Sequence, residues 1–366
     1  MKIKITLLLI TSLFLGCKSH QKTSYDGKSG ATKIVNTLHY SQEKHLKNIK
    51  QLTFGGDNAE AYWSFDNNKL VFQASNIWDL GCDQIFTINI TDDLSKGAKP
   101  QMVSTGLGRT TCSYFLPDNK TIIYSSTHLV DKNCPPVPKK EDYGNKYIWP
   151  VYEGFDIFTA DIQGNQLKQL TFEKGYDAEP TVSPKGDKIV FTSTRTGDLE
   201  LFTMNIDGSD VKQVTDELGY DGGAFFSPDG TKLIFRSSRP KTAEAIKEYK
   251  DLLAEGLVQP TNMELYTCNI DGSELKKITN LGSANWAPFF HPSGKKVIFS
   301  SNHKTKHSFN LFMINLDGTG LEQITFDTVF DAFPMFSPDG KKIVFSSNRN
   351  NNGTHDTNLF IADWVD

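Results

Sequence analysis

The sequence predicts an all-β fold: a closed six-bladed β-propeller whose blades are four-stranded antiparallel sheets. Three observations support this prediction. A strand–turn–strand segment recurs six times, a further turn and strand follow the copies, and the first and last copies complement each other at the chain ends. Regular repeats made of short strands and tight turns are typical of propeller blades.

The first half of each unit reads as two strands joined by a tight turn. Proline presets the backbone at the second turn position, and glycine or asparagine supplies a positive φ near the end of the turn. The second strand is rich in β-branched and aromatic residues. The six segments are AYWSFDNNKLVFQAS, CSYFLPDNKTIIYSS, PTVSPKGDKIVFTST, AFFSPDGTKLIFRSS, PFFHPSGKKVIFSSN and PMFSPDGKKIVFSSN.

The second half of a unit is a third strand, a turn that often contains Asp-Gly, and a short fourth strand such as KQLTF or KQVTD. The last unit stops after its third strand, at 359–364. Residues 50–54, near the start of the chain, match the sequence of a fourth strand, but no first three strands come before them. We expect 50–54 to complete the last blade, because closure of the ring removes open sheet edges.

These motifs resemble the TolB-like propeller family, in particular its SPDGKKIVF repeats, present here at 337–345. The resemblance covers residues 50–366. It implies the propeller fold and carries little information on function. TolB also has an N-terminal α/β domain, which the short polar stretch before the first blade leads us not to expect here. The resemblance therefore does not imply a role in the Tol–Pal system.

The first residues have the pattern of an export signal. A basic start precedes an apolar run that is too short to span a bilayer and has the length of a signal-peptide core. The run ends in Leu-Phe-Leu-Gly-Cys, which resembles a bacterial lipobox with lipid on Cys17; the alternative is an ordinary signal peptide with an incidental cysteine. We expect a signal peptide over 1–16, a flexible tether over 17–48 and the propeller over 49–366.

Composition narrows the possible partners and location. The net charge is −4 with mixed signs, and no basic block or stripe suggests a nucleic-acid partner. The mature chain has no further apolar stretch long enough to cross a membrane. We expect a monomer held in the cell envelope by its lipid, on the periplasmic side of the outer membrane or at the cell surface.

One face of the propeller is expected to carry the function. Loops between blades and loops between strands two and three share this face, and they hold nearly all the variation. Two insertions fall there, at 129–153 and at 240–261, and the second reads as a short amphipathic helix. They act either as a lid over the channel or as packing for neighbouring blades. The helix residues that share one side are Ala245, Tyr249, Leu252 and Leu253.

The repeat register aligns two rings of polar residues near this face. The first ring is Asn58, Thr110, Asp177, Asp221, Asn285 and Asp331. The second ring is Asn76, His128, Arg195, Arg239, His303 and Arg349. Small polar side chains accept hydrogen bonds at turns, and arginine pairs with an adjacent aspartate, so both rings suit a scaffold role. At the channel mouth we expect a ligand-binding site that includes Asn58, Asp177, Asp221, Asn285 and Asp331 of the first ring. Its principal residues are expected where blades depart from the pattern: Glu60, Arg109, Glu179, Trp286, His128 and His303.

A divalent metal is a possible cofactor. Carboxylates suit calcium or magnesium, and the candidate ligands are Asp177, Glu179, Asp221 and Asp331. His128, His303 and His307 are candidates for a transition metal. No EF-hand loop and no G-x-S-x-G nucleophile motif is present in the sequence. Oligogalacturonate lyases look similar in fold and use manganese held by histidines, but the histidines here do not form a matching set.

The cysteines allow one structural crosslink. Export implies an oxidising compartment. Cys82 and Cys134 fall in strand two–three loops of adjacent blades and Cys112 lies near the same face, so any pair of the three is open. We favour Cys82–Cys134. Cys268 falls within a strand and is expected to be a buried apolar residue.

Two functions remain open. The first is a binding or scaffold module whose loop face holds a protein, peptide or glycan. The second is a metal-dependent polysaccharide lyase or hydrolase with its site at the channel mouth. Because no catalytic motif is found, we assign no catalytic residue and favour the binding module.

Overall fold

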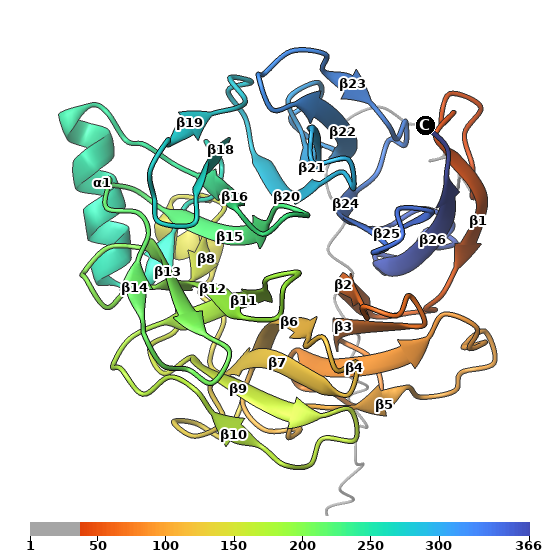
Figure 1. Cartoon of the computed structure of the whole chain (residues 1–366), viewed down its shortest axis with the longest axis horizontal. Helices are drawn as coiled ribbons and strands as arrows, with labels where there is room; N and C mark the ends of the chain where they lie inside the picture. Colours follow the sequence, from red (N-terminus) through yellow and green to blue (C-terminus); the bar gives the residue numbers. More distant parts are fainter. Residues whose placement is uncertain (1–36) are drawn as a thin grey trace, which may run out of the picture. The chain divides into compact units, whose positions relative to one another are not determined.

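The computed structural model describes residues 37–366 and confirms the six-bladed propeller (Figure 1). Each blade is a four-stranded antiparallel sheet. Blade 1 holds β2 (Asp57–Trp63), β3 (Lys69–Ser75), β4 (Gln84–Asn89) and β5 (Gln101–Met102). Blade 2 holds β6 (Thr110–Phe115), β7 (Thr121–Ser126), β9 (Asp156–Asp161) and β10 (Lys168–Gln169). Blade 3 holds β11 (Asp177–Val182), β12 (Lys188–Ser193), β13 (Glu200–Asn205) and β14 (Lys212–Gln213).

The second half of the ring repeats this order. Blade 4 holds β15 (Asp221–Phe226), β16 (Lys232–Ser237), β18 (Glu264–Asn269) and β19 (Lys276–Lys277). Blade 5 holds β20 (Asn285–Phe290), β21 (Lys296–Ser301), β22 (Asn310–Asn315) and β23 (Glu322–Gln323). Blade 6 holds β24 (Asp331–Phe336), β25 (Lys342–Ser347), β26 (Asn358–Trp364) and β1 (Leu46–Gln51). The chain enters each blade at its innermost strand.

The ring closes as predicted, because β1 pairs antiparallel with β26 (Figure 1). Leu46 lies opposite Trp364 and Gln51 opposite Phe360. The closing strand starts four residues before the predicted 50–54 and ends at Gln51. Every sheet in the ring thus has its fourth strand.

A threonine or serine after each fourth strand ties it to the third strand. In blade 3 the Thr215 hydroxyl donates to Glu200 Oε2 at 2.5 Å and accepts at 2.9 Å from the backbone amide that follows Glu200. Thr53 makes the same two bonds in blade 6, to Asn358 and to the amide after it. Thr53 therefore stands at the expected blade position although it is far away in sequence. The six residues are Ser104, Thr171, Thr215, Thr279, Thr325 and Thr53.

Each innermost strand contains one β-bulge, where the register to the second strand shifts. The bulged residue adopts a positive φ of 41° to 59° in all six blades. This conformation costs a residue other than glycine roughly 1–2 kcal/mol, so the surrounding blades must hold it in place. We call these six residues the bulge ring: Glu60, Cys112, Glu179, Gly223, Ala287 and Phe333.

The residues just before β1 pack against blade 6. Glu43 is fully buried, and Arg349 Nη2 donates to it at 2.9 Å. The Arg349 guanidinium also lies 5.5 Å from the centre of the Tyr40 ring. The predicted tether is therefore wrong for residues 38–48, and the propeller begins earlier than residue 49. The predicted signal peptide, Cys17 and the tether up to residue 36 lie outside the described residues.

Candidate functional site

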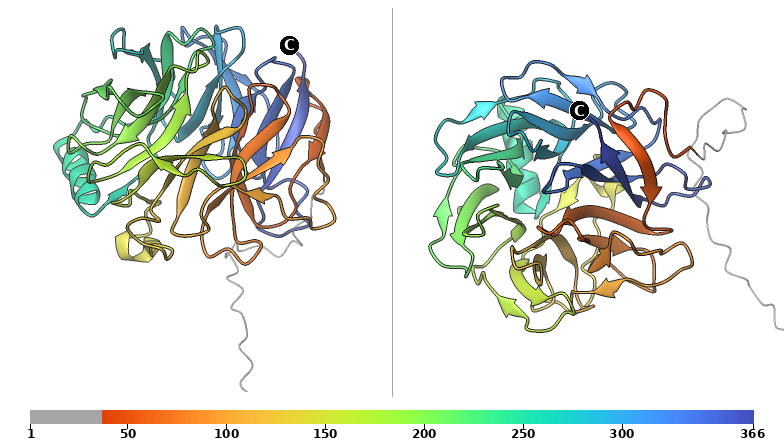
Figure 2. Two further views of the ribbon diagram at one scale, coloured as in Figure 1. Left: turned by 60° about the horizontal axis from the view of Figure 1, so that its bottom comes forward. Right: turned by 45° about the vertical axis from the view of Figure 1, so that its right-hand side comes forward.

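The two insertions meet over the same end of the channel. β8 (Trp149–Pro150) pairs with β17 (Leu257–Val258), which joins the blade 2 insertion to the blade 4 insertion. The predicted helix is α1 (Ala243–Ala254), capped by the side chain of Thr242, and the blade 2 insertion carries one 3-10 turn at Lys140–Tyr143. Figure 2 (left) shows α1 and this turn on the same lower face. Since Trp286 Nε1 also donates to Pro260 O at 2.9 Å, the insertions form a lid fixed to blade 5.

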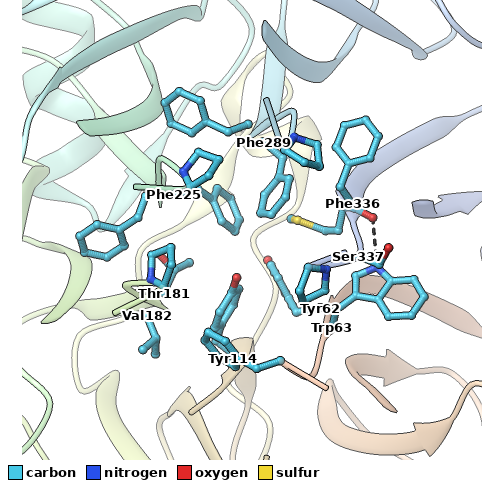
Figure 3. A pocket seen from close by; sticks show the side chains of 17 residues that line it. Tyr62, Trp63, Tyr114, Thr181, Val182, Phe225, Phe289, Phe336 and Ser337 are labelled. Atoms are coloured by element: carbon cyan, nitrogen blue, oxygen red, sulfur yellow. Dashed lines mark hydrogen bonds between the residues drawn. The ribbon is translucent and has the colours of Figure 1, made fainter. Parts of the chain in front are cut away.

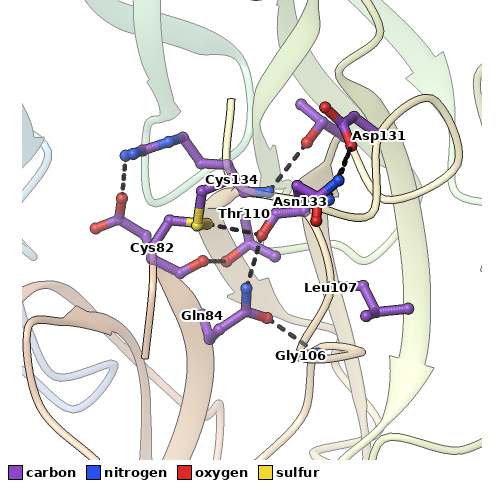
Figure 4. The surroundings of a disulfide bond; sticks show 12 residues. Cys82, Gln84, Gly106, Leu107, Thr110, Asp131, Asn133 and Cys134 are labelled. Carbon is purple, nitrogen blue, oxygen red and sulfur yellow. Dashed lines mark hydrogen bonds and ion pairs between the residues drawn. A yellow bond between two sulfur atoms is a disulfide. The ribbon is translucent and has the colours of Figure 1, made fainter. Parts of the chain in front are cut away.

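A disulfide fixes the start of the blade 2 insertion. Cys134 bonds to Cys82 in the β3–β4 loop of blade 1, with their Cα atoms 5.8 Å apart (Figure 4). This is the pair that the sequence favours. Asp83, the next residue, pairs with Arg109. Cys112 and Cys268 are buried free thiols.

A chamber of about 330 Å³ lies beneath the lid. Its walls combine charged and aromatic side chains, a mixture suited to polar ligands with flat surfaces. The charged side chains are Glu60, Asp83, Arg109, Glu179 and Arg236. The aromatic side chains include Trp149, Tyr152, Phe155, Tyr176, Tyr220 and Trp286.

The bulge ring narrows the axis of the propeller to a neck of about 30 Å³ at the floor of the chamber. A space of this size holds a few water molecules at most. All six bulge residues line the neck. The bulges therefore aim the least repetitive position of the blades at the centre of the channel.

Glu179 is the most highly coordinated carboxylate of the neck. It accepts from Arg236, from Thr192 Oγ1 at 2.7 Å and from the backbone N–H of Gly223 at 2.8 Å. Arg236 also donates to Tyr220 Oη at 2.5 Å and lies over the Trp149 ring, 5.4 Å from its centre. Burial alone would lower the pKa of Arg236, but Glu179 and Tyr220 raise it well above its usual value. This group is a charged pair that supports the lid from below.

Glycine at position 223 is what allows this pair to form. A Cβ at Gly223 would lie 1.8 Å from Arg236 Nη1, so any side chain there would displace the guanidinium. The residue also has φ +58°, which glycine adopts without strain.

Glu60 has fewer partners than Glu179. It accepts from the Tyr62 hydroxyl at 3.1 Å. Burial raises its pKa, Cys112 lowers it by hydrogen bonding, and the nearby Glu179 raises it further. Burial also raises the pKa of the Cys112 thiol, which stays protonated. Burial thus favours the protonated form of Glu60, and its carboxyl is less fully hydrogen-bonded than that of Glu179.

The first predicted ring braces the blades. Asp177, Asp221 and Asp331 pair with Arg195, Arg239 and Arg349 at 2.7–2.8 Å within their own blades. Asn58, Thr110 and Asn285 donate to backbone carbonyls at 2.8–2.9 Å. The neutral members face no arginine: Asn76, His128 and His303 stand there instead. The His128 ring lies 4.5 Å from that of Phe158 and the His303 ring 4.4 Å from that of Phe312, both in tilted arrangements. Burial lowers the pKa of both imidazoles.

The predicted metal ligands do not converge. Asp177, Asp221 and Asp331 each face their own arginine, and Glu179 faces Arg236. Within residues 37–366 no group of three or more His, Cys, Asp or Glu side chains has the arrangement needed to hold a metal ion. The donor set therefore does not fit the divalent metal considered from the sequence, and neither His128 nor His303 supplies one.

Sequence reasoning missed Arg236, Tyr220 and Trp149 as parts of the site. A signal for Arg236 existed, because it occupies the strand-two position opposite the bulge, where other blades carry short or neutral side chains. Those counterparts are Gln73, Ser125, Thr192, Ser300 and Ser346. The only sequence signal for Trp149 was its place in the aromatic segment YIWPVY of the blade 2 insertion.

These features define a β-propeller with an axial chamber under a lid of insertions. A family model described as the TolB β-propeller domain matches residues 151–259 and 257–355, together more than half of the chain. The chain therefore belongs to the TolB β-propeller family.

Solved structures show the same fold at low sequence identity. A putative TolB from Agrobacterium tumefaciens matches with a TM-score of 0.56 and 19% identity, over 85% of this chain and 91% of that chain. TolB from Acinetobacter baumannii matches with a TM-score of 0.51 and 18% identity, over 85% of this chain and 64% of that longer chain. A search of curated sequences found no match.

Proposed function

We propose that the protein is a cell-envelope binding module whose loop-face chamber holds part of a protein, peptide or glycan partner. One observation carries the proposal: two insertions from different blades join over a chamber whose floor is formed by the bulge ring, which includes the acids Glu60 and Glu179. Strained backbone and bulges of this kind concentrate at binding sites.

The chemistry of the chamber indicates the kind of group that it receives. Arg109 Nε and Arg236 Nε are buried without a hydrogen-bond partner, although both guanidinium groups pair with carboxylates. Tyr152 offers a ring face beside Arg109, whose guanidinium lies 5.9 Å from the ring centre. A polar group with acceptor oxygens, presented on a flat or ring-shaped unit, would satisfy both features.

The alternative function, a metal-dependent lyase or hydrolase, has no observation in its favour. The acids proposed for the metal are neutralised by arginines in four separate pairs. Binding without catalysis needs no such metal, which is why the binding module is the better account of this site.

Binding arrays test the chamber. Purified protein is applied to immobilised envelope glycans and peptides, and Tyr152→Ala is compared with wild type. We expect Tyr152→Ala to weaken the bound signals at least tenfold. Leu321→Ala serves as a matched control, because Leu321 is exposed in a strand three–four turn on the opposite face. Equal signals from Tyr152→Ala and wild type would exclude the chamber as the recognition site.

Lipid attachment at Cys17 is the second part of the proposal. Among residues 37–366 no helix is long and apolar enough to cross a bilayer. Two or more acyl chains on Cys17 would hold the propeller stably at a membrane surface. Mass spectrometry of the native N-terminal peptide should find a diacylglyceryl group on Cys17. The Cys17→Ser variant, which cannot carry this group, should be recovered in the soluble fraction instead of the membrane fraction. An unmodified Cys17 thiol would contradict the anchor.

A further inference from the structure

The opposite end of the channel holds a second recess, which we call the cup (Figure 3). It lies on the face of the strand one–two turns and measures about 190 Å³. The innermost strands supply its walls and the turn prolines its rim. Tyr62, Tyr114, Phe225 and Phe289 stand around it, with ring centres 5.3–5.8 Å apart between successive contacts.

The cup is open because blade 3 departs from the repeat. The position two residues after the bulge carries a large side chain in five blades and Thr181 in blade 3. The next position carries an aromatic ring in those five blades and Val182 in blade 3. The five large residues at the first position are Tyr62, Tyr114, Phe225, Phe289 and Met335. Thr181 is therefore smaller than its counterparts, and the Tyr62 ring of blade 1 reaches past it to lie 5.8 Å from the Phe225 ring of blade 4. The remaining volume of the cup borders Thr181.

The lining of the cup selects against charge. None of the 17 described residues that line it is acidic, basic or histidine. Burying an ion there without a partner would be strongly unfavourable. An uncharged apolar molecule would instead remove ring surface from water and fill the space beside Thr181.

One polar group points into this apolar space. The Tyr114 hydroxyl makes no hydrogen bond within residues 37–366, and Figure 3 shows it directed toward the centre of the cup. Burial raises its pKa to about 12, so the hydroxyl stays protonated. The Tyr62 hydroxyl, by contrast, is engaged with Glu60 at 3.1 Å. Tyr114 is therefore the one hydroxyl in the rings of the cup that is free to bond a ligand.

We propose that the cup is a separate binding site for a small uncharged aromatic molecule that carries one hydroxyl or carbonyl group. The volume of the cup accommodates a single ring or a pair of fused rings, and it is smaller than the pockets that bind drug-sized ligands. The neck behind it, at about 30 Å³, is too narrow for a ring to pass. The ligand thus enters and leaves on the turn face, independently of the chamber.

Calorimetric titration with 2-naphthol, which is uncharged at neutral pH, tests the site. We expect saturable 1:1 binding, and 2-naphthoate should bind at least tenfold more weakly because its charge meets no partner. Thr181→Phe should reduce affinity for 2-naphthol at least tenfold by filling the cup, whereas Thr181→Val should leave it within twofold. Absence of 2-naphthol binding up to its solubility limit would overturn the proposal.

Tyr114→Phe keeps the proposal testable if Thr181→Phe does not fold. It preserves the shape of the ring and removes the hydroxyl, so affinity for 2-naphthol should fall roughly three- to tenfold. Affinity for naphthalene, which cannot accept that bond through an oxygen, should not change. An equal loss for both compounds, or no loss for 2-naphthol, would contradict the role of Tyr114.

Discussion

The chamber and the cup lie at the two ends of the same six innermost strands, and they differ in chemistry. Five charged side chains line the chamber, and none lines the cup. The chamber is covered by two insertions, whereas short repeated turns surround the cup. The bulge ring separates them. A single repeat can thus build an electrostatic site and an apolar site, because its alternate positions vary independently.

This difference has a physical origin in how each end is stabilised. Around the chamber, buried charged side chains must be paired. A substitution that removes one charge therefore leaves the opposite charge buried without a partner. Around the cup, large rings pack against each other, and one smaller residue leaves only space. Substitutions at the two ends should therefore differ in their effect on stability, and this expectation can be tested from the largest effect to the smallest.

The largest effect is expected for Arg236→Met. Glu179 would remain buried without its cation, which should lower the free energy of unfolding by about 3–5 kcal/mol. Urea denaturation measures this change. The double variant Arg236→Met/Glu179→Gln should recover at least half of the loss, because no lone charge remains. A double variant as unstable as the single one would show that packing, not charge, supports the chamber.

Loss of the Cys82–Cys134 disulfide should come next. The bond spans 52 residues, and its removal should cost about 2–4 kcal/mol. In Cys134→Ser, limited proteolysis should cut the blade 2 insertion faster, while 2-naphthol binding at the cup stays unchanged. Cys268→Ala, which removes a thiol without touching the lid, is the control. Faster cleavage in both variants would mean that the disulfide does not hold the lid specifically.

Of the two recesses, only the chamber is expected to contribute a pH-dependent effect, through Glu60. The pKa of Glu60 is raised in the folded state, so the folded protein binds this proton more tightly than the unfolded chain. Stability should therefore fall as pH rises above about 4.5, until Glu60 ionises in the folded state. Glu60→Gln should make this dependence less steep and raise stability at pH 8. Asp156 and Glu200, whose pKa values burial raises to about 6 and about 8, should retain their share of the dependence.

Thermal melts from pH 5 to pH 8 provide the measurement for Glu60. Binding of 2-naphthol should be flat over the same range, because the only titrating groups of the cup are tyrosines. A Glu60→Gln variant with an unchanged slope of melting temperature against pH would rule out this carboxyl as the source.

The smallest effects come from removing single hydroxyl groups at the two ends. Tyr220→Phe should cost about 1–2 kcal/mol, because its hydroxyl bonds Arg236 at 2.5 Å. Tyr114→Phe should change stability by less than about 0.5 kcal/mol, since its hydroxyl has no partner to lose. Urea denaturation of the two variants side by side gives the comparison. Equal losses of stability in the two variants would contradict the conclusion that the Tyr220 hydroxyl is hydrogen-bonded in the chamber and the Tyr114 hydroxyl is not in the cup.

The predictable parts of the fold are those that depend on short segments of the repeated sequence. The turn residues Asn67 and Gly340, for example, adopt the positive φ that the turn pattern requires. The closing strand was found because 50–54 matches the fourth strands in sequence. The helix expected within the insertion 240–261 is present as α1, Ala243–Ala254. Local chemistry fixes each of these features without knowledge of distant contacts.

What escaped prediction depends on contacts between blades. The pairing of β8 with β17 joins segments about a hundred residues apart that have no repeat pattern. Arg236 reaches Glu179 of the neighbouring blade because a bulge turns Glu179 toward the axis and the glycine at position 223 leaves room for the guanidinium. Glu43 was predicted to lie in a polar tether, but it is buried and paired with Arg349 of the distant blade 6. The cup required a comparison of Thr181 with its counterparts for size rather than for charge.

The closing strand also sets an order of events during biosynthesis. β1 leaves the ribosome first, but its partner β26 is among the last segments to be translated. Five blades can assemble while β1 waits with an unsatisfied edge, a state that chaperones would have to shield. Leu46 and Trp364 can meet only after β26 has been translated, so a chain that stalls before residue 358 cannot seal the ring. Closure of the ring thus reports that all six blades have been made.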